Sequence, residues 1–257
     1  MTKVINFLFI IFSEIEHYFY VRFNRFILRD NKKQILDSLI SDGYIKIGNF
    51  ISDEKIRTFR KIILNNYKEK IEHLNNDVYL GGLRLTDIKK INFLMKSFFN
   101  DPFILSVVKS FQLSNHSLKT MYQISQFKKI NILKTNNNTI TGLGRRWHVD
   151  SWKHGLKVML LLSDVETKNG PMIVIKKSNK LFCKSMKFYN KISSFLRCFP
   201  NFNSNHLQYN SSDIYNKENI VELKGKAGDL FIIDTRMVHR AGVMKDGNRQ
   251  VLWNYFS

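Results

Sequence analysis

Two histidines and one aspartate have the types and spacing of a metal site. His148 and Asp150 stand two residues apart, and side chains two apart on a β-strand point to the same face. Both would therefore project into the interior of a β-barrel, where an imidazole and a carboxylate together suit a borderline metal such as Fe(II). His239, which follows the apolar run 230–233, is the candidate third ligand. Three such ligands leave positions open for reactants, as in a facial triad.

A metal with open positions becomes an oxygenase centre only if electrons reach it, and a 2-oxo acid supplies two of them. The distal carboxylate of such a cosubstrate needs a cation at the far end of the pocket. Arg249 stands ten residues beyond His239, at the start of a predicted strand, and a guanidinium binds a carboxylate in a bidentate pair. Each residue alone is a weak signal, so the hypothesis depends on their order, spacing and flanking sequence.

The elements expected to position these residues are helices in the first half of the chain and short strands in the second. Ser52 before two acids is typical of a helix cap, and Asn169-Gly170 between apolar runs predicts a β-hairpin. The expected helices cover 32–41, 53–77 and 101–111. The expected strands cover 44–47, 118–133, 156–163, 172–175, 230–234 and 250–256, with a loop over 135–144 and an irregular insertion over 181–222.

This order of elements predicts a mainly β protein with flanking helices, built as a jelly-roll barrel. A chain of 257 residues can form one core, and neither an internal repeat nor a low-complexity linker divides it. We expect an N-terminal helical lead-in over residues 1–30 and one domain over residues 31–257.

Eight short segments between about residues 34 and 256 form a more specific pattern. They are Asp42-Gly43-Tyr44, Phe50-Ile51-Ser52, Trp147-His148-Val149-Asp150, Leu162-Ser163-Asp164-Val165, Asn169-Gly170-Pro171, Gly228-Asp229-Leu230-Phe231-Ile232-Ile233-Asp234, His239-Arg240-Ala241-Gly242 and Arg249. In these segments the chain resembles the phytanoyl-CoA dioxygenase family. The resemblance implies a double-stranded β-helix, a cupin-like jelly-roll barrel. It also implies that His148, Asp150 and His239 bind Fe(II), that Arg249 binds 2-oxoglutarate, and that dioxygen is the other cosubstrate.

The sequence departs from the family pattern at two places. Lys176-Lys177-Ser178-Asn179 stands where the family often has Pro-Gly-Ser-His, and Ala241 stands where a small hydroxyl residue often helps to bind the cosubstrate. Related halogenases replace the carboxylate ligand with a small residue. Since Asp150 is present, the resemblance implies hydroxylation of a C–H bond, with release of succinate and carbon dioxide.

Four further residues are candidates for contact with small molecules. Gln126, on the predicted strand 118–133, could bind 2-oxoglutarate or substrate. Arg145 and Arg146 directly precede the metal strand and could meet an anionic substrate, although a solvated loop explains them equally well. Trp152 could form an apolar wall of the site or pack in the core. The substrate itself is expected to be a small or carrier-linked molecule.

The formal net charge of +20 would attract anionic partners. A codon bias toward Lys, Asn, Ile and Phe would also produce such a charge, with solubility as its one effect. The alternative to an enzyme is a catalytically idle jelly-roll module that binds an anionic glycan, nucleic acid or membrane surface. Because the sequence contains no base-reading motif, nucleic acid is not the expected partner.

The N-terminal segment has the character of a surface helix. Its apolar run 4–12 is too short to span a bilayer, which takes about 20 apolar residues. Arg22, Arg25 and Arg29 follow among aromatic residues on one helix face, so residues 1–29 could lie on a membrane or pack on the domain. We expect a cytoplasmic protein without a secretory signal, with peripheral binding to the inner face of the membrane as the alternative. Removal of this segment is expected to leave the barrel intact.

Overall fold

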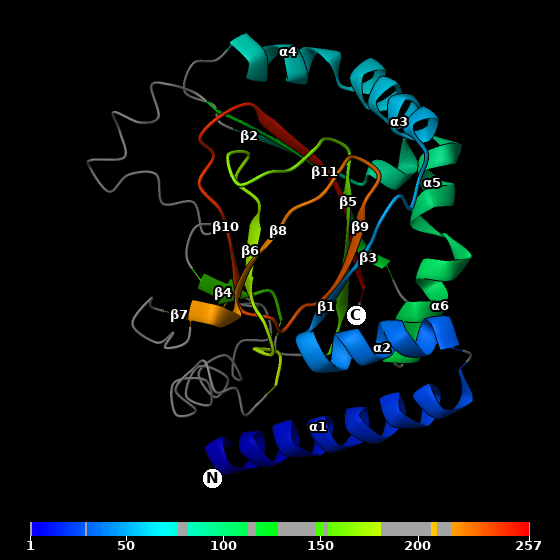
Figure 1. Ribbon diagram of the computed structural model, residues 1–257, viewed down its shortest axis with the longest axis vertical. Coiled ribbons are helices and arrows are strands. Elements are labelled where there is room, and N and C mark those ends of the chain that lie inside the picture. Colours follow the sequence, from blue (N-terminus) through cyan, green and yellow to red (C-terminus); the bar gives the residue numbers. More distant parts are fainter. Residues whose placement is uncertain are drawn as a thin grey trace.

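The protein is described by a computed structural model that covers residues 2–28, 30–76, 82–112, 117–127, 147–151, 154–180, 207–209 and 217–256. Within these ranges two antiparallel β-sheets face each other, and helices cover the outer side of the larger sheet (Figure 1). The fold is the expected double-stranded β-helix, mainly β with flanking helices.

The larger sheet has the strand order β1-β9-β5-β11-β3-β2, and the smaller sheet has the order β7-β4-β10-β6-β8. In the larger sheet the strands are β1 (Tyr44–Ile47), β9 (Leu230–Asp234), β5 (Leu156–Leu161), β11 (Asn248–Phe256), β3 (Ser117–Gln126) and β2 (Gly82–Thr86). In the smaller sheet they are β7 (Leu207–Tyr209), β4 (Trp147–Val149), β10 (His239–Ala241), β6 (Met172–Ile175) and β8 (Ile220–Leu223).

The helices surround the larger sheet and one end of the β-fold. They are α1 (Thr2–Ile27), α2 (Asp30–Asp42), α3 (Asp53–Asn66), α4 (Lys68–Asn76), α5 (Phe93–Phe99) and α6 (Pro102–Phe111), with single 3₁₀ turns at Ile88–Lys90 and Lys217–Asn219. Asp101 caps α6 by accepting hydrogen bonds from the first backbone amides, and Ser52 caps α3 in the same way, as the sequence predicts.

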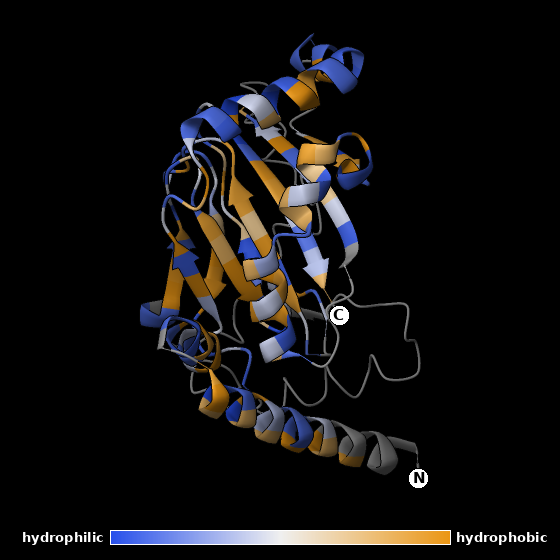
Figure 2. Cartoon of the chain, turned by 90° about the vertical axis from the view of Figure 1, so that its right-hand side faces the viewer, coloured by the Kyte–Doolittle hydropathy of each residue, from blue (hydrophilic) through white to orange (hydrophobic). Residues whose placement is uncertain are grey.

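Strand β5 shows how alternation divides the core. Leu156, Val158 and Leu160 pack toward the helices, while Met159 and Leu161 point between the two sheets. Both faces of β5 are thus buried, which explains its nearly unbroken apolar sequence. Figure 2 shows the same hydrophobic character along the central strands.

Two predictions of local structure are wrong. Asn169-Gly170 does not close a hairpin, because β5 belongs to the larger sheet and β6 to the smaller, where β6 pairs with β8 and β10. The chain crosses between the sheets at this turn. The predicted helix 53–77 is two helices, since α3 ends at Asn66 and α4 starts at Lys68, with Tyr67 as the C-cap between them. Each helix has its own buried row, and the break lets both rows face the core.

Helix α1 packs along α2 and α6 at one end of the β-fold (Figure 1). Glu14 forms a salt bridge with the buried Arg236, which also pairs with Asp234 at 3.3 Å. The His17 ring donates a hydrogen bond to the carbonyl of Phe111 at 2.8 Å and stacks on His154, with 3.5 Å between ring centroids. In the described residues no helix is long and apolar enough to cross a membrane. The contacts of Glu14 and His17 argue against the expectation that removal of residues 1–29 leaves the stability of the barrel unchanged.

Replacement of Glu14 by Gln tests this attachment. The variant removes one charge from a buried guanidinium but leaves Asp234 as its partner, so the free energy of unfolding should fall by about 1.5–3 kcal/mol, the contribution typical of a hydrogen bond to a charged group. Urea unfolding of both proteins measures the difference. The control is Glu16→Gln, an exposed acid on the same helix, which should change stability by less than about 0.5 kcal/mol. Equal stabilities of the two variants would contradict a structural role for Glu14.

Candidate metal centre

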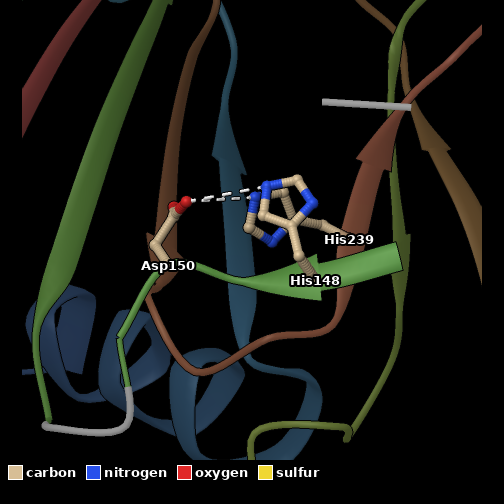
Figure 3. A group of neighbouring side chains, drawn as sticks. All are labelled: His148, Asp150 and His239. Atoms are coloured by element: carbon tan, nitrogen blue, oxygen red, sulfur yellow. Dashed lines mark ion pairs between the residues drawn. The ribbon is translucent and has the colours of Figure 1, made fainter. Parts of the chain in front are cut away.

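The two histidines of the predicted triad lie on neighbouring strands of the smaller sheet. His148 on β4 and His239 on β10 are direct partners in the antiparallel register. Directly opposed residues on paired strands present their side chains on the same face, so both rings point into the interior. Their ring centroids are 4.3 Å apart (Figure 3). His239 stands at the first position of the short strand β10.

Asp150 completes the group from the residue just after β4. Its backbone N–H donates to the carbonyl of Thr235 at 3.0 Å, which ties the end of β4 to the chain just before β10. Its Oδ1 lies 3.9 Å from Nε2 of His148 and 3.4 Å from Nε2 of His239. The three ligand atoms all lie within 4.8 Å of one another, so an ion bonded at about 2.0–2.2 Å to each needs only small inward shifts. Two imidazoles and one carboxylate are the donor set of an Fe(II) facial triad.

A backbone hydrogen bond fixes the orientation of the His239 ring. Its Nδ1 lies 2.8 Å from the carbonyl of Met237. Because a carbonyl can only accept, Nδ1 carries the hydrogen, and Nε2 keeps its lone pair for the interior. Met237 is itself held against Gly43, which has φ 85°; a Cβ at that position would lie 2.7 Å from the Met237 sulfur. The Asp-Gly-Tyr motif of the sequence thus packs directly behind a candidate ligand.

The turn before His239 is held by buried polar groups. Asp234 accepts hydrogen bonds from the side chain of Asn179 at 3.1 Å and from the backbone of Arg236 at 2.9 Å. Ser178 accepts from the backbone N–H of Val238 at 2.8 Å. The segment 176–179, where the sequence departs from the family pattern, therefore supports the turn before β10 through Ser178 and Asn179.

Lys157, which the sequence analysis missed, lies among the ligand atoms. It reaches from β5 in the opposite sheet, and its ammonium donates to Oδ2 of Asp150 and, at 2.9 Å, to Nε2 of His239. Its side chain is 1% exposed. The sequence did carry a signal, because Lys157 is the one charged residue in the strand 156–161. A lysine seldom lies in a strand buried on both faces unless it is paired.

Asp150 and Lys157 stabilise each other's charged forms. Burial alone would raise the pKa of Asp150, but the charge of Lys157 and its hydrogen bond to the carboxylate hold that pKa well below its usual range. Burial lowers the pKa of Lys157, and the carboxylate of Asp150 offsets part of this effect. Asp150 is therefore a carboxylate, and Lys157 occupies Oδ2 while Oδ1 faces the histidines.

Arg249 lies on β11 with its side chain on the interior face of the larger sheet. It is 9% exposed, and within the described ranges no carboxylate forms an ion pair with it. Burial, followed by the nearby charge of Arg84, lowers the pKa of Arg249 to about 10. A buried cation with this environment is suited to bind an anion. Val251 and Trp253 continue the same face of β11 toward Lys157, whose ammonium lies 5.6 Å from the Trp253 ring centroid.

Of the other predicted contact residues, the structure describes Gln126 alone, and it does not bring this residue to the triad. Gln126 has the strand parity of Tyr122 and Ile124, which pack toward the helices, and its side chain donates to Asn75 of α4 at 2.7 Å. The interior positions of β3 are instead those of Met121, Gln123 and Ser125. Arg145, Arg146 and Trp152 lie outside the described residues.

The fold and the site together define a double-stranded β-helix with a candidate two-histidine, one-carboxylate metal centre. The family model of phytanoyl-CoA dioxygenase (PhyH) matches residues 40–248. The chain belongs to the phytanoyl-CoA dioxygenase family, and it is accordingly a non-haem iron, 2-oxoglutarate-dependent enzyme that uses dioxygen. No curated protein matches the chain.

Three solved structures illustrate the likeness of fold. The epimerase SnoN, in complex with Fe³⁺, α-ketoglutarate and nogalamycin RO, is 13% identical, with 88% of this chain and 83% of that chain covered and a TM-score of 0.57. The carbocyclase SnoK of nogalamycin biosynthesis is 14% identical, with 87% and 83% covered and a TM-score of 0.57. HygX from Streptomyces hygroscopicus, with nickel and 2-oxoglutarate bound, is 11% identical, with 90% and 87% covered and a TM-score of 0.56. At these identities the comparison supports the fold alone.

Replacement of Lys157 by Met tests its place in the centre. An ion bound by the triad must displace the ammonium from His239 and share Asp150 with it, so the variant should bind Co(II) at least about tenfold more tightly. Calorimetric titration of metal-free protein measures the affinity. Lys96→Met, at an exposed position on α5, controls for the loss of one positive charge and should leave the affinity unchanged. A weaker affinity in Lys157→Met would mean that the lysine mainly orients Asp150.

Proposed function

We propose that the protein hydroxylates a C–H bond of a small or carrier-linked molecule, with His148, Asp150 and His239 as the ligands of Fe(II). The observation that carries this proposal is the convergence of three donor atoms within 4.8 Å in the interior of a phytanoyl-CoA dioxygenase fold. The carboxylate ligand favours hydroxylation over halogenation, since Asp150 fills the position that a halide would need.

Bound iron would activate dioxygen, the oxidant of this reaction, in which dioxygen and 2-oxoglutarate yield one hydroxyl group on the substrate, succinate and carbon dioxide. The protein's part is to orient the reactants and to exclude water. Two facing sheets with buried apolar side chains, among them Met159, Leu161 and Val251, enclose the interior. A dry interior strengthens every charge interaction made within it.

Arg249 is proposed to bind the distal carboxylate of 2-oxoglutarate. Its guanidinium is buried on the interior face of β11, and the apolar residues Val251 and Trp253 lie between it and the triad along the same strand. A cosubstrate with one carboxylate at Arg249 would lie over this apolar surface, with its 2-oxo acid end toward the metal ligands. No role is proposed for Gln126, because its side chain points toward α4.

The substrate class remains part of the proposal. Structures of similar fold hold nogalamycin RO and hygromycin B, which are small molecules, and we propose a small-molecule substrate here. The net charge of +20 favours a substrate that carries negative charge.

The reaction and the triad are tested together. Wild-type protein with Fe(II) and 2-oxoglutarate should show a charge-transfer absorption band without oxygen and should form succinate with oxygen. When a metabolite library is supplied together with ¹⁸O₂, the product should gain one labelled oxygen, even in high chloride. His239→Ala should lose the band and the turnover, because two remaining ligands hold the ion too weakly.

The control for this experiment is His73→Ala on α4, which should retain both signals. If the band persisted in His239→Ala, His239 would not be a ligand. A chlorinated product from the wild type would overturn the hydroxylase assignment.

Arg249→Leu tests the cosubstrate site separately. Removal of one partner from a buried charge pair costs about 2–5 kcal/mol, so binding of 2-oxoglutarate should weaken at least about tenfold, while iron affinity changes little. Titration of the charge-transfer band with 2-oxoglutarate measures this constant. The matched control is Arg57→Leu, an exposed arginine on α3. An unchanged constant in Arg249→Leu would assign the carboxylate to another cation.

A further inference from the structure

The outer face of α1 is the most hydrophobic surface in the described part of the chain. Of the 12 large hydrophobic residues that are exposed there, eight lie on this helix. Six of them follow one another at intervals of three or four residues, which places them in one stripe along the helix. The stripe consists of Leu8, Phe12, Ile15, Phe19, Phe23 and Phe26, and each is at least 46% exposed.

The opposite face of α1 is held by the protein. Val21 is buried against the core, Glu14 pairs with Arg236, and His17 donates to the carbonyl of Phe111. A helix on the surface of a globular protein normally buries its apolar stripe and exposes its charges. Here the polar side chains of Glu14 and His17 are among those that make the inward contacts, and the aromatic stripe faces outward. Rotation of α1 to bury the stripe would break these inward contacts.

We propose that this stripe docks the protein onto an anionic lipid bilayer, with α1 lying in the plane of the membrane surface. An exposed row of Phe, Leu and Ile beside basic residues is the pattern of an interfacial helix. Arg22 lies beside the stripe, with its guanidinium 4.5 Å from the centre of the exposed Tyr18 ring, where an aromatic and a cation would meet lipid headgroups.

Net charge decides between a membrane and a second copy of the chain as the occupant. Two copies that met through α1 would each carry a charge of +20, and their repulsion opposes association. An anionic bilayer is attracted by the same charge, and each basic residue near its surface strengthens binding. Charge complementarity therefore favours acidic lipid over both a partner copy and an uncharged bilayer.

Docking through α1 would fix the orientation of the metal centre relative to the membrane. Glu14 of α1 contacts Arg236, which lies three residues before His239. The membrane would lie at the end of the β-fold where the chain enters β10 and leaves β4. This inference does not depend on the hydroxylase proposal.

The test is cosedimentation with phosphatidylcholine vesicles that either contain or lack phosphatidylserine. Wild-type protein should pellet with the anionic vesicles and bind the uncharged ones at least about tenfold more weakly. The double variant Phe19→Ser, Phe23→Ser should bind anionic vesicles at least about tenfold more weakly than wild type, because it removes two large apolar side chains from the contact.

The matched control is Phe93→Ser, Leu94→Ser, which removes an exposed Phe and an exposed Leu from α5. It should bind anionic vesicles as wild type does. Equal binding of wild type and the α1 variant would overturn the proposal, as would equal binding to both kinds of vesicle. Light scattering after gel filtration tests the alternative of a second copy. If wild type were a dimer, did not bind vesicles, and became a monomer in the α1 variant, the stripe would be a dimer interface instead.

Discussion

A carboxylate between two apolar sheets must be compensated by positive charge, and this requirement shapes the centre of the protein. Asp150 lies in the interior, where an isolated charge would be strongly disfavoured. Lys157 provides the compensating charge by reaching across from the larger sheet to one carboxylate oxygen, while His148 and His239 of the smaller sheet lie close to the other. The centre therefore bridges the two sheets, and its geometry depends on the distance between them.

A second buried charge outside the candidate metal centre is compensated in the same way. Arg236 and Asp234 are a second buried ion pair, located in the turn that leads to His239. Asn179 and Glu14 each add a hydrogen bond to this pair, so a loop after β6 and a helix at the start of the chain both converge on this turn. The position of one candidate metal ligand thus depends on residues more than 200 positions away in sequence.

The sequence predicted those features that are encoded locally. Strand 44–47 and strand 230–234 have the expected bounds, and the helix capped by Asp101 ends at Phe111 as expected, because turns and caps mark the ends of these elements. The two histidines and Asp150 were found from spacing and flanking motifs. Pairing between strands is not local, so Asn169-Gly170 suggested a hairpin where the chain in fact changes sheets. The direction of the Gln126 side chain toward α4 was not predictable for a related reason, because alternation groups residues by face but does not identify the interior face. The role of Lys157 could not be predicted from its apolar strand, because the contact with Asp150 forms only when the two sheets pack together.

The stacked rings of His17 and His154 make the attachment of α1 sensitive to acid. Burial, and then the charge of Arg236, lower the pKa of His17 from 6.5 to about 4. Burial and the same arginine lower the pKa of His154 as well, so both rings are neutral at neutral pH. A histidine whose pKa is depressed by folding stabilises the native state above its unfolded pKa, and this contribution is lost as the pH falls from 6.5 to about 4. Protonation would set a new cation against Arg236 and so weaken the attachment of the helix that carries the aromatic stripe at low pH.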